Sequence, residues 1–331
     1  MMKWIIAFLV CSCFILPQAS GQPHQLRIAV AANAQFVIKE LQADFKKRSG
    51  INTEVIIGSS GSINGAGQYS EADFYCGGAG SDTITGGQGN DHIYGNSITT
   101  PMGAVDGADS LSGGGGNDYI QGNAGNDTID GGTGNDRLYG GSDNDSILGG
   151  DGNDYLQGNR GIDTLRGGDG ADTLHGGADS DILYGDAGKD QLFGDAGNDT
   201  LIGGAGADTM TGGAGIDLFS FGRSDALITS GGSNTYSLDE IIDFTHGTDH
   251  IGLGFSVHSL FAGTASSLAN AMTYANTVLQ AHPGEADVAA VAVGSDTYLF
   301  YNAGGAGGAA DSAIKLDGVT ASTLTIAVDF V

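Results

Sequence analysis

The chain has 331 residues with 60 glycines and only 4 prolines, and its 39 acidic against 12 basic residues give a formal net charge of −27. A surface this acidic repels nucleic acid and anionic lipid, which excludes both as partners. A disulfide framework is excluded as well, because two of the three cysteines lie in an N-terminal apolar segment and only Cys76 remains. We expect such a polyanion to stay disordered unless a cation neutralises it.

Residues 1–21 have the pattern of a secretory signal peptide. Lys3 precedes an apolar segment at Trp4–Leu16, and Ala19-Ser20-Gly21 forms a small-residue cleavage site. The apolar segment has 13 residues, which is too short to span a bilayer. We therefore expect a mature chain that starts at Gln22, has no membrane span and is secreted to the extracellular space.

Residues 22–76 form a short unit of a different kind, with a linker at its end. Apolar patterning predicts a strand at Leu26–Ala32, an amphipathic helix at Gln35–Arg48 and a second strand at Thr53–Ile57. This is a truncated β-α-β fragment.

The run AVAANAQFVIKELQADFKKRSGINTEVIIGSSG in this fragment resembles the start of periplasmic molybdate-binding proteins. That resemblance implies oxyanion donors at Asn33 and at Ser59 or Ser60, and it gives an alternative function, a periplasmic oxyanion-binding fragment fused to repeats. It covers about forty residues. A fragment of a two-lobed fold does not by itself carry the site between the lobes.

An internal repeat dominates the chain. Gly77–Ser220 divides into sixteen nonapeptides, such as GGTGNDRLY and GDAGNDTLI, with aspartate at the sixth position of 15 units and an apolar residue at the eighth of all 16. The third unit, GNSITTPMG, has Thr100 in place of the aspartate but keeps Met102 in the apolar position. We expect the nine-residue register to run through it unbroken.

Each position of the repeat has a physical role. Glycines permit the positive φ angles of a tight turn, and where one is missing an Asn or Asp usually replaces it, at Asn123, Asp143, Asn159, Asp179, Asp186 and Asp195. Positions seven to nine predict a three-residue strand with the eighth side chain inward and the seventh and ninth outward. Two nonapeptides make one coil, so the predicted fold is all-β: a right-handed parallel β-roll.

The core of such a roll is too thin to hold its 23 carboxylates unaided. Carboxylates and main-chain carbonyls are hard oxygen ligands, which suit Ca²⁺ rather than zinc or copper. The predicted calcium ligands are the sixth-position aspartates Asp82, Asp91, Asp109, Asp118, Asp127, Asp136, Asp145, Asp154, Asp163, Asp172, Asp181, Asp190, Asp199, Asp208 and Asp217.

These units match the G-G-x-G-x-D-x-apolar-x pattern, so the chain resembles the repeats-in-toxin (RTX) hemolysin-type calcium-binding proteins over 144 residues. The resemblance implies that each ion lies between the turns of one unit and of the unit two further on. Sixteen units give 14 such pairs, and the degenerate third unit removes two, which leaves up to 12 ions. It also implies folding outside the cell in calcium and the type I secretion machinery as a partner.

Residues 221–331 contain less glycine and longer apolar segments. Apolar patterning predicts a helix at Ser266–Gln280 and strands at Glu240–Phe244, His250–Leu253, Val288–Val293, Tyr298–Tyr301, Ile314–Leu316 and Thr325–Val331. The stretch from Asp217 to Leu253 resembles the domain that follows the repeats in serralysin-type proteases, and the tail Asp329-Phe330-Val331 is similar to a type I secretion signal. We expect a mostly-β cap over the last coil.

No catalytic motif is present. His246 and His250 have the spacing of a zinc site, and His258 follows, but Gly247 and Thr248 favour a loop over the helix that such a site needs. The sequence therefore predicts a secreted calcium-binding protein that is not an enzyme. An enzyme or toxin that has lost its effector half is a further alternative, and a gene fusion near residues 64–76 would explain the truncated N-terminal fragment.

Overall fold

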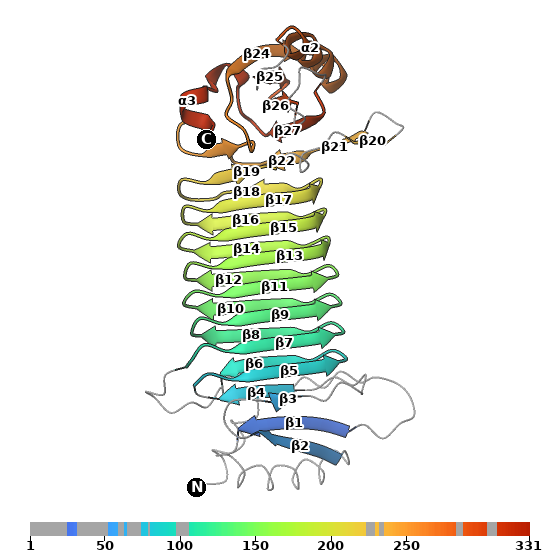
Figure 1. Cartoon of the computed structure of the whole chain (residues 1–331), viewed down its shortest axis with the longest axis vertical. Coiled ribbons are helices and arrows are strands. Elements are labelled where there is room, and N and C mark those ends of the chain that lie inside the picture. Colours follow the sequence, from blue (N-terminus) through green and yellow to red (C-terminus); the bar gives the residue numbers. More distant parts are fainter. Residues whose placement is uncertain are drawn as a thin grey trace.

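The computed structural model describes residues 25–31, 52–58, 63–64, 74–78, 80–96, 106–222, 229–231, 235–282, 287–302 and 310–331. Its centre is a long roll of parallel strands, with the C-terminal residues at one end and strands β1 and β2 at the other (Figure 1). The predicted signal peptide, the helix at residues 35–48, and Asn33, Ser59 and Ser60 lie outside the described residues.

Two sheets form the roll, and the chain passes from one to the other after every strand. The first sheet contains, in order along the roll, β4 (Phe74–Gly78), β6 (His92–Asn96), β8 (Tyr119–Ala124), β10 (Arg137–Ser142), β12 (Tyr155–Arg160), β14 (Thr173–Ala178), β16 (Gln191–Ala196) and β18 (Thr209–Thr211). The second contains β3 (Ile63–Asn64), β5 (Thr83–Gln88), β7 (Ser110–Gly115), β9 (Thr128–Thr133), β11 (Ser146–Asp151), β13 (Thr164–Gly170), β15 (Ile182–Gly188), β17 (Thr200–Gly206) and β19 (Leu218–Ser220). Neighbours within each sheet pair in parallel, for example Leu156 with Leu174, so the prediction of a parallel β-roll is confirmed.

The strands are longer than the predicted three residues. Most have six, because each continues from positions seven to nine into the first three positions of the next unit. Along β12 every second residue is buried: Leu156 at position eight and then Gly158 at position one of the next unit. The first glycine is therefore part of the strand and not of the turn.

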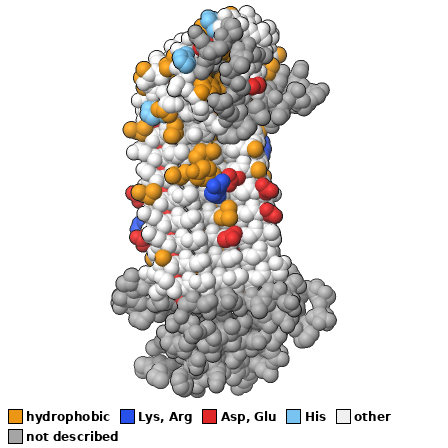
Figure 2. All heavy atoms as spheres, viewed as in Figure 1, with side chains coloured by type: hydrophobic (Ala, Val, Ile, Leu, Met, Phe, Trp, Pro, Cys, Tyr) orange, Lys and Arg blue, Asp and Glu red, His pale blue; other side chains and the backbone are white. Residues whose placement is uncertain are grey.

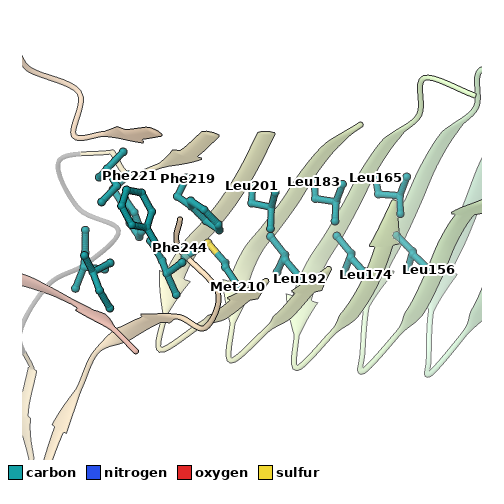
Figure 3. Packing of buried hydrophobic residues seen from close by; sticks show 14 of the residues in the cluster. Leu156, Leu165, Leu174, Leu183, Leu192, Leu201, Met210, Phe219, Phe221 and Phe244 are labelled. Atoms are coloured by element: carbon teal, nitrogen blue, oxygen red, sulfur yellow. The ribbon is translucent and has the colours of Figure 1, made fainter. Parts of the chain in front are cut away.

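Two files of apolar side chains from the eighth positions meet inside the roll. Every member is at most 1% exposed, and Figure 3 shows the file with Leu165, Leu183 and Leu201 facing the file with Leu174 and Leu192. Phe219, Phe221 and Phe244 close the core at its C-terminal end (Figure 3). The sequence pattern thus predicted this core correctly.

The predicted unbroken register is wrong at the third unit. Strand β5 pairs with β7 through Ile84 and Leu111, an offset of 27 residues, whereas β7 pairs with β9 through Leu111 and Ile129, an offset of 18. The connection from β6 to β7 is therefore nine residues longer than the regular repeat requires. A nine-residue insertion preserves the apparent frame of the sequence, so periodicity alone does not reveal it.

The turn residues adopt the backbone conformations that their types predict. The described non-glycine residues with positive φ, between 70° and 83°, are the six Asn and Asp residues expected there: Asn123, Asp143, Asn159, Asp179, Asp186 and Asp195. Side chains of these two types tolerate the left-handed region best. This prediction is confirmed in full.

The predicted N-terminal strands extend the first sheet. β1 (Gln25–Ala31) and β2 (Asn52–Gly58) pair in parallel over seven residues, which agrees with the two strands of the expected fragment. β1 also pairs with β4 through Ile28 and Phe74. The fragment is therefore an extension of the roll's sheet.

The cap continues both sheets before it becomes a separate layer. β22 (Asp239–Ile241) pairs with β18, and β23 (His250–Gly252) pairs with β19. β27 (Ser312–Leu316), β26 (Asp296–Tyr301), β25 (Asp287–Val293) and β24 (Ser259–Ala265) follow β22 in the first sheet, and a separate hairpin joins β20 (Thr229–Gly231) to β21 (Thr235–Ser237). The sequence did not predict β24, β20 or β21.

Helix α2 (Leu268–Gln280) lies where a helix was predicted, with Ala271, Ala275 and Leu279 buried in the cap core. The predicted terminal strand at residues 325–331 is wrong, because Ile326–Asp329 form the short helix α3 and a 3-10 turn precedes it at Ala321–Thr323. The buried carboxylate of Asp329 accepts hydrogen bonds from the N–H groups of Thr325, at 2.6 Å, and Gly247, at 3.2 Å. The bond from Thr325 closes a helical turn, and the bond from the distant Gly247 holds it against the cap.

The first glycine of each unit leads to a stability prediction. A Cβ on Gly176 would lie 2.5 Å from Asp181 Oδ2 and 2.9 Å from the carbonyl oxygen of Gly194. Gly176→Ala should therefore destabilise the calcium-saturated protein by about 1–3 kcal/mol, as overpacking does in other cores. The measurement is denaturant unfolding in saturating calcium.

The matched control is Gly115→Ala at the third position. There the new Cβ would meet only the flexible side chain of Gln88, so the change should stay within about 0.5 kcal/mol. Equal losses for the two variants would contradict the proposed role of the first glycine.

Candidate metal sites in the turns

All fifteen predicted aspartates are buried where a turn leads into a strand. The exposed fraction of each is 8% or less. Few acidic side chains are visible on the face of the roll in Figure 2, although Gly77–Ser220 contains 23 of them. Burial of carboxylates on this scale is costly unless each is paired or bound to a metal.

Hydrogen bonds connect the aspartates along the roll. The backbone N–H of each donates to the Oδ1 atom of the aspartate in the next coil, as from Asp145 to Asp163 and from Asp163 to Asp181, both at 2.8 Å. There are two such ladders, one on each side of the roll. They run through Asp82, Asp109, Asp127, Asp145, Asp163, Asp181, Asp199 and Asp217, and through Asp91, Asp118, Asp136, Asp154, Asp172, Asp190 and Asp208.

The nine extra residues do not break either ladder. Asp82 donates to Asp109 at 2.8 Å and Asp91 to Asp118 at 2.6 Å, each across 27 residues. The expected loss of two turn pairs at the third unit is therefore wrong. Gly95 takes the place of the first glycine for Asp109, since a Cβ on Gly95 would lie 2.1 Å from Asp109 Oδ2.

The second carboxylate oxygen is the unusual atom of the site. In twelve of these aspartates Oδ2 is buried and has no hydrogen-bond donor, namely in Asp109, Asp118, Asp127, Asp136, Asp145, Asp154, Asp163, Asp172, Asp181, Asp190, Asp199 and Asp217. Each lies against a first-position glycine, that of its own unit or, for Asp109, Gly95, and in most of these turns the carbonyl oxygen of a glycine in the next coil is also close, as Gly194 is for Asp181. The fold thus brings carboxylate oxygens without a donor close to main-chain carbonyl oxygens.

Burial raises the pKa of these carboxyls strongly, and the backbone hydrogen bond to each offsets only part of the effect. The pKa rises from 3.8 to about 8 for Asp145 and Asp181, to about 7 for Asp154 and to about 6 for Asp163. Neighbouring aspartates of the same ladder add to the rise for Asp145 and Asp181. Without a cation, burial in the fold therefore favours the protonated form of these carboxyl groups.

The donor set fits a hard divalent cation. Orphaned carboxylate oxygens with neighbouring carbonyl oxygens are the ligands that Ca²⁺ prefers. Among the described residues no three His, Cys, Asp or Glu side chains converge on one point, so a site that needs a side-chain cluster, as zinc does, is not found there. A calcium ion in these turns would take many of its ligands from the main chain.

Two further aspartates continue the ladders into the cap, and the sequence reasoning missed both. Asp208 donates to Asp239 Oδ1 at 3.0 Å, and Asp217 donates to Asp249 Oδ1 at 3.1 Å. Their sequence signal is the spacing of aspartate and apolar residue in Asp239-Glu240-Ile241 and Asp249-His250-Ile251, which repeats positions six to eight of the nonapeptide. Irregular spacing of 31 and 32 residues hides it from a search for a nine-residue period.

Asp249 differs from the other members because its Oδ2 accepts the N–H of Thr245 at 2.7 Å. Beside it, Asp243 accepts the N–H groups of Gly212 and Gly213 at 2.9 and 2.8 Å. At this end of the roll, protein N–H groups take the place that a cation would fill elsewhere.

Asparagines at the fifth position form a separate amide ladder next to the aspartate ladders. The N–H of Asn135 donates to Asn117 Oδ1 and that of Asn153 to Asn135 Oδ1, both at 2.9 Å. The same bond joins Asn144 to Asn126 at 3.1 Å. This role for the many G-N-D sequences was not predicted.

Two cap histidines contact the C-terminal tail. The ring of His246 contacts Asp329 at 2.8 Å, and His250 Nδ1 contacts the carbonyl oxygen of Val328 at 2.8 Å. These contacts attach the C-terminal tail to the cap. His246 lies in a turn, as expected for a loop histidine, whereas His250 is the first residue of strand β23, so the loop interpretation is wrong for His250.

Comparison with known proteins supports the interpretation of the repeats. The model of the RTX calcium-binding nonapeptide repeat family matches residues 71–97 and overlapping segments that together cover residues 104–219. The interval between these matches lies within the longer connection from β6 to β7. No curated protein sequence matches the chain.

Two solved structures are similar to parts of the chain. The AlgE6R3 subunit of the mannuronan C5-epimerase from Azotobacter vinelandii is 31% identical, with a TM-score of 0.34, over 49% of this chain and 78% of that one. The extracellular lipase LipA from Serratia marcescens is 14% identical, with a TM-score of 0.28, and this chain spans about half of it, 47%. At these TM-scores neither likeness assigns an activity to this chain. The periodic aspartates and the family match lead to one conclusion: residues 71–97 and 104–219 consist of RTX calcium-binding nonapeptide repeats.

Proposed function

We propose that this chain is a secreted, non-enzymatic calcium-binding repeat protein whose roll folds when Ca²⁺ occupies its turns. The observation that carries the proposal is the row of twelve buried Oδ2 atoms without a hydrogen-bond donor. Uncompensated buried carboxylates destabilise a fold, and a divalent cation shared by neighbouring turns removes that cost. Calcium is then part of the folded structure and not an addition to it.

The assigned ligands are the fifteen sixth-position aspartates and, in addition, Asp239. Fifteen ladder hydrogen bonds join neighbouring turns, including the two into the cap, so the number of turn pairs exceeds the 12 expected from the sequence. Asp249 ends its ladder without an ion, since Thr245 already occupies its second oxygen. The ligands at each ion are one or two carboxylates and main-chain carbonyls.

Export follows from the same charge balance. In low calcium the net charge of −27 keeps the chain unfolded, which suits passage through a secretion channel. Outside the cell, calcium in the range of about 10⁻⁴–10⁻³ M fills modules of this kind. We assign residues 1–21 to a signal peptide, 22–76 to the N-terminal extension, 77–220 to the repeats and 221–331 to the cap with a secretion signal. Among the described residues no helix is both long and apolar enough to cross a membrane.

Calcium should convert the chain from coil to strand. In chelator the far-UV circular dichroism spectrum of the full chain should be mainly that of a coil, because the buried carboxylates repel one another. About 10 mM Ca²⁺ should produce a strand spectrum, and the same Mg²⁺ should not, since Mg²⁺ requires a tighter octahedral site. Identical spectra with chelator and with calcium would falsify the proposed function.

Loss of one aspartate should have a local effect. Asp154 takes part in two ladder contacts, with Asp136 and with Asp172. Asp154→Asn should lower the number of bound ions by no more than these two contacts, because each coil of a solenoid touches only its neighbours. Equilibrium dialysis with radioactive calcium measures that number.

Asp169→Asn is the matched control, since Asp169 is exposed on the second sheet and should leave the ion count unchanged. If Asp154→Asn abolished all calcium binding, the sites would not be near-equivalent members of an array. If it changed nothing, Asp154 would not be a ligand.

The raised pKa values predict an opposite response to pH with and without calcium. A folded-state pKa above the unfolded value of 3.8 stabilises the metal-free roll at low pH, and this stability is lost as the pH rises through about 6 to about 8. In chelator, strand signal should therefore be greater near pH 5 than near pH 8. The first pH lies between the unfolded pKa and the raised pKa values, and the second lies at or above the raised values. Calcium affinity should fall as the pH is lowered through the same interval, because protons then compete for the carboxylates. A chelated chain that gains strand structure as the pH rises would contradict the assignment.

A further inference from the structure

Aromatic rings form a continuous row on the outer face of the first sheet. Every strand from β6 to β16 contributes at least one outward ring, and the members of this aromatic ladder are His92, Tyr94, Tyr119, Tyr139, Tyr155, His175 and Phe193. Neighbouring ring centroids are 4.5 to 5.9 Å apart along the whole row. The ladder thus spans six successive strands of one sheet.

The second sheet has no such row. At the outward seventh and ninth positions of β5 to β19, Tyr184 is the single aromatic residue among the described strands. Aromatic contacts between neighbouring strands stabilise sheets in general. Yet these strands pair in the same parallel register and have similar lengths without them, so the roll does not need the ladder in order to fold.

The aromatic ladder is also set apart by its charge. At the outward seventh and ninth positions of β6 to β16 there is no carboxylate, and Arg137 is the one permanently charged residue. Amide side chains alternate with the rings instead. The hydroxyl of Tyr119 donates to Gln121 Oε1 at 3.4 Å, and that of Tyr155 donates to Gln157 Oε1 at 3.2 Å.

A cleft of about 410 Å³ lies at the start of the same strands. Its lining includes Asn135 and Asn153 from the amide ladder and Arg137 and Tyr155 from the outer face of the first sheet, but also Asp136 and Asp154, two of the proposed calcium ligands. Asn135 and Asn153 each accept a backbone N–H through Oδ1, and each donates its own backbone N–H to the asparagine of the preceding coil. These bonds fix the orientation of both side chains. The cleft therefore belongs to the metal sites in the turns, and the outer face beside it presents the rings and their neighbouring amides.

We propose that the aromatic ladder, with the amides of Gln121 and Gln157 beside its rings, binds an uncharged linear polysaccharide laid along the roll. The apolar C–H faces of sugar rings pack on aromatic rings, and sugar hydroxyls pair with amides, so alternation of the two suits a carbohydrate better than a purely apolar partner. A row with one ring or more per strand fits a ligand that is itself long and repetitive. The net charge of −27 repels acidic polymers at long range but not a neutral one.

This inference goes beyond calcium binding, and its test uses the full chain in calcium. Native gels are cast with hydroxyethylcellulose, glucomannan or dextran as uncharged probes and with polygalacturonate as an acidic one. The wild-type chain should be retarded by at least one uncharged probe. Tyr139→Thr combined with Tyr155→Thr should weaken that binding by about tenfold or more, which corresponds to the loss of two aromatic contacts. Threonine is chosen because Thr173 already occupies an equivalent outward position in β14.

Two variants control for folding. Tyr184→Thr removes a ring from the opposite sheet and should bind as the wild type does. Tyr139→Phe combined with Tyr155→Phe keeps the rings and should retain affinity within about threefold, since the stacking surface is preserved. Circular dichroism in calcium shows whether each variant is folded, and the Phe pair gives the result if the Thr pair is not.

The proposal is overturned if no uncharged probe retards the wild-type chain, or if the folded Thr pair is retarded as strongly as the wild type. Retardation by polygalacturonate alone would also overturn it and would make the ligand an acidic glycan held by arginine. A ring-dependent dimer in sedimentation velocity, without retardation by any glycan, would make the ladder a contact between copies of this chain.

Discussion

The structure depends on one constraint: a carboxylate must lie against a backbone that has no side chain. In each described turn the second oxygen of the sixth-position aspartate fills the place where a Cβ on the first glycine would be, as Asp181 does at Gly176. The same glycines, without a side chain, also allow successive turns to approach closely. The same contact leaves an anionic oxygen buried, which is costly unless a cation lies beside it.

This arrangement divides the stabilising interactions between two regions. The interior contributes one apolar side chain per unit, from Ile84 to Phe219, which is little for a chain with this many glycines. The turns contribute the aspartate hydrogen bonds, which repeat with the coils, and the proposed ions would lie beside them. Because both terms add up coil by coil, stability should grow with the number of filled turns. The cap ends the series differently, by placing N–H groups from Thr245 and from the last turns against its own carboxylates.

Most of the roll could be predicted from the sequence because its rules are local. Glycine, asparagine and aspartate determine the turns, so even the residues with positive φ, such as Asn159 and Asp186, were identified correctly. Pairing between strands that are distant in the sequence could not be predicted from such local rules. The nine extra residues between β6 and β7 keep the frame of nine, and Asp239 and Asp249 are ladder members at irregular spacing, so only the strand register in space revealed them. The short helix α3 also escaped prediction, because it depends on the contact between Asp329 and the distant His246 loop.

The most direct test of the account is to locate the ions. Crystals grown in calcium should show anomalous scattering peaks between successive turns, next to the orphaned Oδ2 atoms of both ladders, from Asp109 to Asp199 and from Asp118 to Asp190. No peak is expected between Asp217 and Asp249, where Thr245 already serves the carboxylate. A well-ordered roll whose turns contain only water, with the aspartates protonated or hydrogen-bonded, would contradict the claim that calcium is part of this fold.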